Sequence, residues 1–259
     1  MGWDYNWKAG PKGGTLVTLD TYASKIRQVA EIDTGLRGMD PLIQYAHGAR
    51  WTRKWAGTKE IMLEIFLRYT NAAGAITHGD GAAGHAYENL AAIRGLFGGD
   101  QGSQATLQQT APDWGTVLLD VDQLSPSMPT QARFVFGFLL YAADPFWRAS
   151  SQSSSTGNPA VGGNAPAYPI IEFTVSGTDS KVVHDDSGAS IQIDGTLPAG
   201  GVSVDCLAQT CTKISDGTDY SANLTLNKAY WMILDPDGTN TLTRSGGGTQ
   251  TVKWNDRWK

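Results

Sequence analysis

The sequence predicts a mainly β protein of two domains, with a single helix in the first. Of the 259 residues 31 are glycine and 9 tryptophan, and only 17% are charged. Plentiful glycine together with aromatic and β-branched residues favours turn-rich β structure. Beyond residue 168 short candidate strands recur at roughly ten-residue spacing, which is typical of a β-sandwich. Residues 151–167, rich in Ser, Gly, Asn and Pro, have almost nothing to bury.

The first domain is organised around residues 131–148. Both faces of the expected strand there are apolar, with Phe134, Phe136, Phe138 and Leu140 on one and Val135, Leu139 and Tyr141 on the other. Such a strand needs cover on both sides, either from the domain's own core or from core on one face and a neighbouring subunit on the other. Asp144-Pro145 ends the pairing because proline has no N–H to donate. We therefore expect a first domain at 1–150, a linker at 151–167 and a second domain at 168–259.

Other elements of the first domain follow from their periodicity. Glu60–Tyr69 alternates as a strand with one buried and one mixed face. Within His85–Phe97 apolar residues recur at helical spacing, and Gly98-Gly99 ends the run. A short strand is expected at Thr15–Asp20, and a mixture of strand and loop at Ser24–Leu36. Ala105–Gln109 and Thr116–Val121 are expected to form a hairpin.

In the second domain glycine-containing turns separate eight candidate strands. They are Ile170–Val175, Lys181–His184, Ser190–Ile193, Val202–Cys206, Thr212–Ile214, Tyr230–Leu234, Asn240–Arg244 and Gln250–Trp254.

Charge and segment composition exclude some classes of protein. The net charge of -5 argues against a general nucleic-acid binder, which is expected to be basic. No apolar stretch is long enough to span a bilayer, and the N-terminus lacks the pattern of a signal peptide. We expect synthesis in the cytoplasm, where Cys206 and Cys211 stay free thiols, although a hairpin could bring them face to face.

Two glycine- or acid-rich segments resemble ligand sites without meeting their requirements. Residues 79–84 match G-x-G-x-x-G before the helix, but no strand runs straight into the first glycine and no βαβ unit follows, so no cofactor is expected. Residues 235–240 begin like a calcium loop, but Gly246 stands where the bidentate Glu is required. A Pro/Asp/Gly turn explains that segment better.

No catalytic constellation and no metal site is predicted. His78, Asp80 and His85 could supply metal ligands, but a glycine-rich loop holds ligands poorly. Paired carboxylates such as Asp120 and Asp122 could support glycoside hydrolysis only if they converged, and the alternative is solvated strand ends. No nucleophile elbow or histidine triad is present.

Tryptophans suggest contact surfaces rather than chemistry. Residues 50–55 interleave basic and aromatic side chains, including Trp51 and Trp55, which we interpret as a strand edge or a subunit interface. In the second domain Trp231, Trp254 and Trp258 could stack on sugars, although tryptophans of sandwiches are usually core or rim residues.

The order of landmarks along most of the chain resembles the distal tail proteins of long-tailed phages, the siphovirus tail-component family. The landmarks are Leu36–Met39, His47-Gly48, the Glu60–Tyr69 strand, the helix near Tyr87–Phe97, Ala143–Trp147, Tyr168–Ile171, Val202–Asp205, the Trp231–Asn240 turn, Val252–Trp254 and Arg257-Trp258. One departure is Asp237, inserted between Pro236 and Gly238.

The resemblance implies an N-terminal split-barrel-like β domain and a C-terminal galectin-like β-sandwich. It implies a homohexameric ring that joins the tail tube protein to the tip or baseplate hub in the virion, with the genome passing through its channel. It carries no catalytic residues, metals or cofactors. We assign the ring interface to Phe134, Phe136, Phe138, Tyr141, Trp51 and Trp55.

Two other functions remain open at this stage. A carbohydrate-binding adhesion module would recognise host cell-wall glycans through Trp231, Trp254 and Trp258. A cell-wall glycosidase would release sugar from purified walls. A ring could also carry glycan-binding domains.

Overall fold

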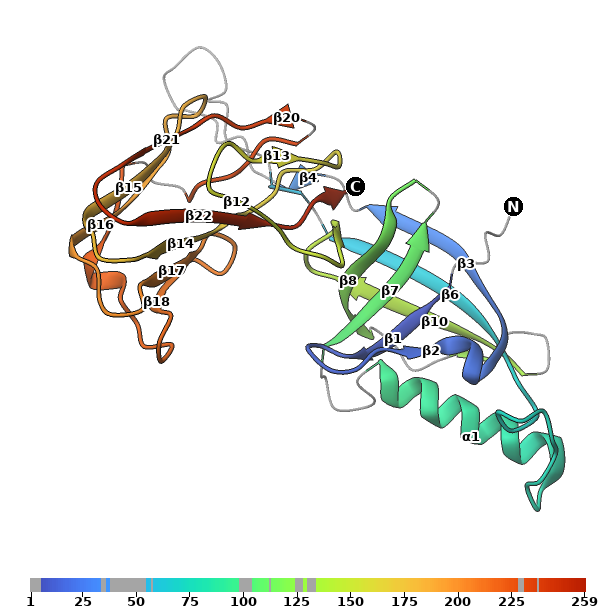
Figure 1. Cartoon of the computed structure of the whole chain (residues 1–259). Coiled ribbons are helices and arrows are strands. Elements are labelled where there is room, and N and C mark those ends of the chain that lie inside the picture. Colours follow the sequence, from blue (N-terminus) through green and yellow to red (C-terminus); the bar gives the residue numbers. More distant parts are fainter. Residues whose placement is uncertain are drawn as a thin grey trace, which may run out of the picture. The chain divides into compact units, whose positions relative to one another are not determined.

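The computed structural model describes residues 6–33, 36–37, 55–56, 58–97, 104–111, 113–123, 128–129, 134–227, 231–236 and 238–259. The chain divides into two compact units, residues 1–147 and 148–259. Both consist mainly of antiparallel strands, with one α-helix among the described residues (Figure 1). The predicted mainly β fold is therefore confirmed.

The first unit contains ten short and long strands, one α-helix and a 3-10 helix within the described ranges. They are β1 (Lys8–Pro11), β2 (Val17–Thr18), η1 (Leu19–Thr21), β3 (Ala23–Asp33), β4 (Leu36–Arg37), β5 (Trp55–Ala56), β6 (Lys59–Leu67), α1 (Gly81–Leu96), β7 (Ala105–Ala111), β8 (Gly115–Gln123), β9 (Met128–Pro129) and β10 (Val135–Ala142).

The main sheet of this unit is divided into two halves. Its strand order is β2-β1-β7-β8-β10-β6-β3, with β9 on β10, while β4 and β5 pair separately. β7 and β8 form a hairpin through seven residue pairs, and β10 pairs with β6 through eight. The two halves meet where Leu140 and Tyr141 pair with Gln123 and Asp122. This narrow junction gives the unit its split-barrel character.

Strand β6 shows why the sequence folds in this way. Its burial alternates strictly from Lys59 to Leu67, so that Ile61, Leu63 and Ile65 are fully buried on one face. Most of Ser24–Leu36, which is predicted as strand and loop, belongs to one strand, β3, because bulges at Ala23/Lys25 and Gln28/Ala30 keep it paired with β6 despite its irregular alternation.

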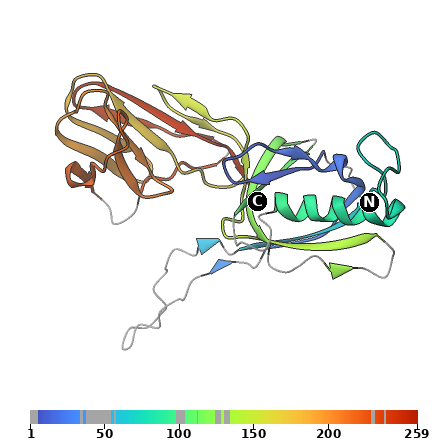
Figure 2. The same cartoon turned by 90° about the horizontal axis from the view of Figure 1, so that it is seen from below.

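Helix α1 lies against the strands as its periodicity predicts. It begins at Gly81 rather than His85, and it buries Ala86, Leu90 and Ile93. Just after its end, the Phe97 ring lies 5.6 Å from the ring of Phe138 on β10. Figure 2 shows the helix running between the β1–β2 side and β10 of this unit.

The second unit is a two-layer sandwich of short strands. They are β11 (Trp147–Ala149), which begins at the last residue of the first unit, β12 (Ser153–Ser155), β13 (Ala160–Val161), β14 (Ile170–Thr174), β15 (Thr178–His184), β16 (Ser190–Thr196), β17 (Val202–Asp205), β18 (Thr210–Lys213), η3 (Ser221–Asn223), β19 (Leu224–Leu226), β20 (Gly238–Thr239), β21 (Leu242–Ser245), β22 (Thr249–Trp254) and β23 (Arg257–Trp258).

The two layers of the sandwich enclose one hydrophobic core. One sheet has the order β12-β22-β14-β17-β18 and the other β19-β16-β15-β21. Phe173 and Val204 of the first sheet pack in the same cluster as Val182 and Ile193 of the second. Alternate residues of facing strands thus fill the space between the sheets, as in other β-sandwiches.

The segment 151–167 differs from the predicted linker. β12 pairs with β22, β13 pairs with β20, and Ala167 forms a bridge with Leu234. Val161, Ala165 and Ala167 are buried. The composition concealed this role because serine backbones pair with an existing strand as well as any other, while three small apolar residues suffice to anchor the segment. The boundary between the units lies after Trp147 rather than after residue 150.

The predicted strand Tyr230–Leu234 is also not a strand in its described part. Residues 231–233 are irregular, and Leu234 makes an isolated bridge. Met232 and Leu234 are nevertheless fully buried. The apolar alternation therefore reflects an irregular segment that inserts two side chains into the core.

We predict that a fragment of residues 148–259 unfolds cooperatively and is more stable than a fragment of residues 168–259. The shorter fragment loses β12 and β13, which uncovers an edge of β22 and removes the buried side chain of Val161. The expected loss is about 2 kcal/mol or more, measured by urea denaturation of both fragments. Equal stabilities would show that residues 148–167 are a linker after all.

Candidate functional site

The outer face of the β3–β6–β10 sheet is the candidate functional site of the first unit. Opposite the buried face of β6, the side chains of Met62 and Phe66 are half-buried. In the register of the sheet Met62 lies beside Leu139, and Glu60 lies beside Tyr141. The centre of this outer face is therefore apolar and only partly covered by the chain itself.

Charged side chains from β3 and β6 lie on the same face. Arg27 pairs with Glu64 in the register, and its Nε lies 3.7 Å from Glu64 Oε2. Lys25 lies opposite Phe66. A face with an apolar centre and charges of both signs is typical of non-obligate contacts between proteins.

The structure places the six predicted interface residues differently. Phe138 is fully buried and packs on Phe97, so it belongs to the core and the prediction for it was wrong. Phe134 has a φ of 64° and precedes β10, where its carbonyl accepts a hydrogen bond from Leu67 N–H at 2.9 Å. Phe136 and Tyr141 are half-buried.

The two tryptophans of that prediction are not informative here. Trp51 lies outside the described residues, and the structure describes only the backbone of Trp55, in β5. Their assignment to an interface stays a prediction.

Behind this sheet lies a buried ion pair. The Lys59 side chain is only 1% exposed, and its ammonium nitrogen lies 2.5 Å from Glu31 Oε1. Gln28 Nε2 donates to Glu31 Oε2 at 2.6 Å, and Trp147 Nε1 donates to Glu31 Oε1 at 3.2 Å. Burial raises the pKa of the Glu31 carboxyl, but the hydrogen bond and charge of Lys59, helped by Gln28 and Trp147, outweigh it and leave the pKa lowered.

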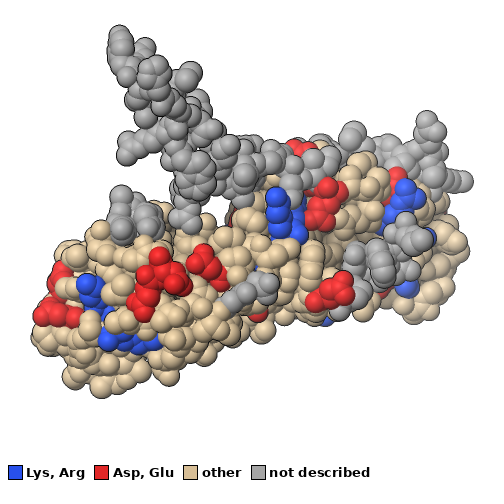
Figure 3. Space-filling view, turned by 90° about the horizontal axis from the view of Figure 1, so that it is seen from above, with Lys and Arg blue, Asp and Glu red and all other residues tan. Residues whose placement is uncertain are grey.

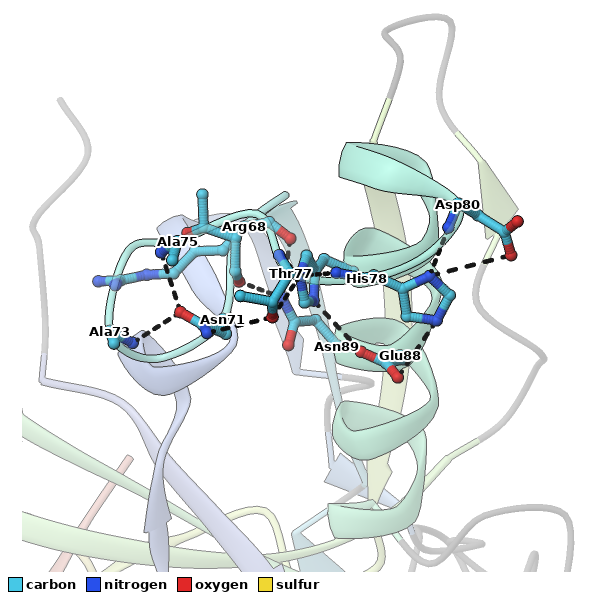
Figure 4. A network of polar contacts seen from close by, with 11 residues as sticks. Arg68, Asn71, Ala73, Ala75, Thr77, His78, Asp80, Glu88 and Asn89 are labelled. Carbon is cyan, nitrogen blue, oxygen red and sulfur yellow. Dashed lines mark hydrogen bonds and ion pairs between the residues drawn. The ribbon is translucent and has the colours of Figure 1, made fainter.

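A polar network ties the loop of residues 70–80 to the start of α1 (Figure 4). His85 Nε2 accepts the backbone N–H groups of Thr77 at 2.8 Å and His78 at 2.9 Å. His78 Nδ1 accepts the N–H of Asp80 at 3.0 Å. Each ring therefore carries its proton on the other nitrogen, toward Glu88. In this arrangement one nitrogen of each ring accepts a hydrogen bond from the loop backbone, and the other faces Glu88.

The G-x-G-x-x-G match has a local structural explanation. Gly81 begins the helix with a φ of 66°. A Cβ at Gly84 would lie 2.0 Å from His78 Nδ1. The His78 ring can therefore pack on the helix only because residue 84 has no side chain. These two glycines thus allow the turn into the helix and the packing of His78. A dinucleotide site also requires a strand that leads into the first glycine, and the described residues before Gly79 form none.

In the second unit His184, Asp186 and Asp235 come within 4.8 Å of one another, a convergence that the sequence could not reveal. His184 is fully buried, and both of its ring nitrogens already have partners, Ser187 Oγ at 2.8 Å and Asn240 Oδ1 at 3.0 Å. Asn240 Oδ1 also accepts the N–H of Asp235 at 2.7 Å. The His184 ring therefore links the turn at Ser187 to the segment from Asp235 to Asn240 through hydrogen bonds.

The three tryptophans predicted to bind glycans differ in burial. Trp254 is 5% exposed, belongs to the core cluster, and donates through Nε1 to Asp256 Oδ1 at 3.1 Å, so its assignment as a glycan contact was wrong. Trp231 is half-buried and packs against the same core. Trp258 is half-buried in β23.

Cys206 and Cys211 are free and buried. Cys211 pairs with Val204 in the register of β17 and β18, which makes the two cysteines diagonal rather than direct neighbours. Burial, with the charge of Asp205 adding to it, raises the pKa of the Cys206 thiol well above its ordinary range. Burial and Asp219 raise the pKa of Cys211 to about 11.

On the face drawn in Figure 3, acidic and basic side chains of the described residues lie interspersed among uncharged surface. None of the described helices has the length and apolar character to cross a membrane.

Comparisons with known proteins place this fold in a class. Residues 162–258 match the family of the siphovirus-type tail component, C-terminal domain. The landmarks from Tyr168 onward lie within this match, and the buried Arg257 packs on the Tyr168 ring at 5.1 Å. No curated protein matches the chain.

Solved structures show the same fold over nearly the whole chain. The chain is similar to the Dit protein (gp 19.1) of phage SPP1, described as a paradigm of the hub adsorption apparatus of phages that infect Gram-positive bacteria, with 14% identity, a TM-score of 0.65 and coverage of 98% of this chain and 99% of that one. It is also similar to a chain of the phage P2 baseplate in its activated conformation with Ca, at 9% identity and a TM-score of 0.50 over 97% and 98% of the two chains.

We predict that Glu31→Gln lowers the free energy of unfolding at pH 7, because the buried Lys59 ammonium then loses the charge of Glu31. The expected loss is about 2 kcal/mol, less than the about 3–5 kcal/mol of a fully buried pair, since 30% of the Glu31 side chain is exposed. A lowered pKa in the folded state means that the wild-type protein holds this stability above the ordinary carboxyl pKa and loses it as pH falls below about 5. Urea denaturation across pH 3–7, which covers that window, measures both effects.

The matched control is Glu64→Gln, which removes the looser pair with Arg27 and should change stability by less than about 1 kcal/mol. An equal loss for the two variants would contradict a special role of the buried pair.

We predict that neither cysteine reacts with a thiol reagent at pH 8 in the folded protein, because the thiolate form is disfavoured and buried. Both should react within the same assay once urea unfolds the chain. Rapid labelling of the native protein, followed by mass spectrometry, would contradict this.

Proposed function

We propose that this chain is a structural virion protein of a long-tailed phage, a distal tail ring that joins the tail tube to the tip or baseplate. The observation that carries the proposal is the shared fold with the SPP1 Dit protein over 98% of the chain. The family match of residues 162–258 supports it independently of the first unit. The role is structural rather than enzymatic.

We propose the outer face of the β3–β6–β10 sheet as a surface where copies of the chain meet. Met62, Leu139 and Tyr141 form a half-buried apolar centre that a second copy could cover. Arg27 and Glu64 next to it supply charges that can fix the register of a contact. In a closed ring each copy uses two different patches, and the rotation repeats until the ring shuts.

The partners in this proposal are other copies in a homohexamer, the tail tube protein and the tip or baseplate hub protein. The protein would reside at the tail tip of the virion after synthesis in the host cytoplasm. Contact with the genome in the channel would be without sequence specificity. No cofactor is required.

The carbohydrate-binding alternative has less support than the ring. One of its three tryptophans lies in the core of the sandwich and another packs against it. Binding of cell-wall glycans by the isolated sandwich would therefore depend on Trp258, on the exposed part of Trp231 or on other side chains.

We predict that the purified full-length protein forms closed rings and that Leu139→Glu prevents them, because a buried carboxylate without a partner is costly at a subunit contact. Light scattering gives the mass, and negative-stain imaging shows whether the rings are closed. The expected result is a mass of several subunits for the wild type and a lower mass for the variant.

The matched control is Leu207→Glu, which introduces the same charge at a side chain of the second unit that is already 57% exposed. It should assemble like the wild type. A strictly monomeric wild-type protein, or a Leu139→Glu variant that assembles fully, would contradict the proposed self-assembly.

A further inference from the structure

The His85 side chain of α1 holds residues 77 and 78 of the loop of residues 70–80 against the helix. The loop has its own internal order, because the Asn71 side-chain oxygen accepts the N–H groups of Ala73 and Ala75. Its connection to the helix is made by His85, which is 5% exposed and accepts two backbone N–H groups of the loop. Asn89 Nδ2 adds hydrogen bonds to the carbonyls of Arg68 and Thr70, at the start of the loop.

The protonation state of His85 follows from these contacts. A backbone N–H can only donate, so Nε2 must present a lone pair to Thr77 and His78. The single ring proton is then on Nδ1, which lies 3.3 Å from Glu88 Oε2. The closed loop therefore requires the neutral form of His85 with this one tautomer.

We propose that His85 is a pH-sensitive latch, which holds the loop on α1 when neutral and releases it when a second proton binds to Nε2. In the imidazolium form Nε2 becomes a donor and would face two donors at 2.8 and 2.9 Å. Both hydrogen bonds must then break. An open loop leaves the ring in water, where it takes up the proton from solvent in the pH range that is ordinary for histidine.

Other charged groups around His85 modify this equilibrium without restoring the lost acceptor. Glu88, on the same helix, attracts a positive ring, but its side chain is 59% exposed and screened by water. From the loop, the His78 ring lies edge-on at 5.5 Å, and Asp80 lies 3.9 Å from His78 Nδ1. From the end of β6, the Arg68 side chain is directed to the carbonyl of Ala23.

Proton linkage determines whether a fall in pH favours the open or the closed loop. The open loop binds one more proton than the closed loop once the pH is below the ordinary range of histidine. Opening must therefore increase as pH falls, by about tenfold between pH 7.5 and 5.5 for one histidine that takes up the second proton only in the open loop.

Amide hydrogen exchange of the full-length protein tests the latch. After correction for the intrinsic exchange rates, the amides of Thr77 and His78 should open about tenfold more at pH 5.5 than at pH 7.5. The amides of Leu63 and Ile65 in β6 serve as internal controls and should not change. Equal opening of Thr77 and His78 at both pH values overturns the proposal, whether or not any variant folds.

Two variants identify the group that is responsible. In His85→Gln the side-chain oxygen can still accept a hydrogen bond but does not titrate, so the pH dependence should disappear while the loop stays closed. His78→Gln is the matched control and should keep the pH dependence. The proposal is overturned if His85→Gln retains the full response, or if His78→Gln alone abolishes it.

Discussion

The buried ammonium of Lys59 places a strong constraint on how the first unit folds. A charge at that depth is tolerated only beside a counter-charge, and Glu31 on the neighbouring strand supplies it. The Glu31 carboxylate also receives a hydrogen bond from Trp147, the last residue of the unit. One polar cluster thus fixes the pairing of β3 with β6 and attaches the end of the unit to both.

The strand pattern of the first unit was largely readable from the sequence, because side chains of β6 alternate strictly between core and surface. Phe138 shows the limit of that reading. Apolar residues on both faces of a strand indicate that both faces are covered. They do not indicate which face packs on the core of the same chain. Phe97, at the end of α1, covers Phe138, and this contact joins residues that are far apart in the sequence. Leu139 and Tyr141, on the opposite face, are the residues left half-covered.

In the second unit the errors have a common cause. The low apolar content of residues 151–167 predicts a linker, yet backbone pairing with β22 and β20 needs no apolar side chains. The alternating apolar residues of the segment ending at Leu234 predict a strand, yet this segment enters the core without pairing along its length. Composition reports burial, and hydrogen bonding between strands is a separate property. His184 and Asp235 lie close together in the fold although they are far apart in the sequence, so the sequence alone does not predict their proximity.

The six residues from Gly79 to Gly84 look like a single motif but consist of positions under unequal constraint. Around Gly79 no atom lies within 4 Å of the place a side chain would take, whereas at Gly84 the His78 ring already occupies that place. A Cβ at position 79 meets no neighbouring atom, so substitution of Gly79 causes no clash there. Substitution of Gly84 requires a change at His78 as well. A motif search that weights the two equally would therefore lose true relatives of this loop and retain chains in which the packing that explains it is absent.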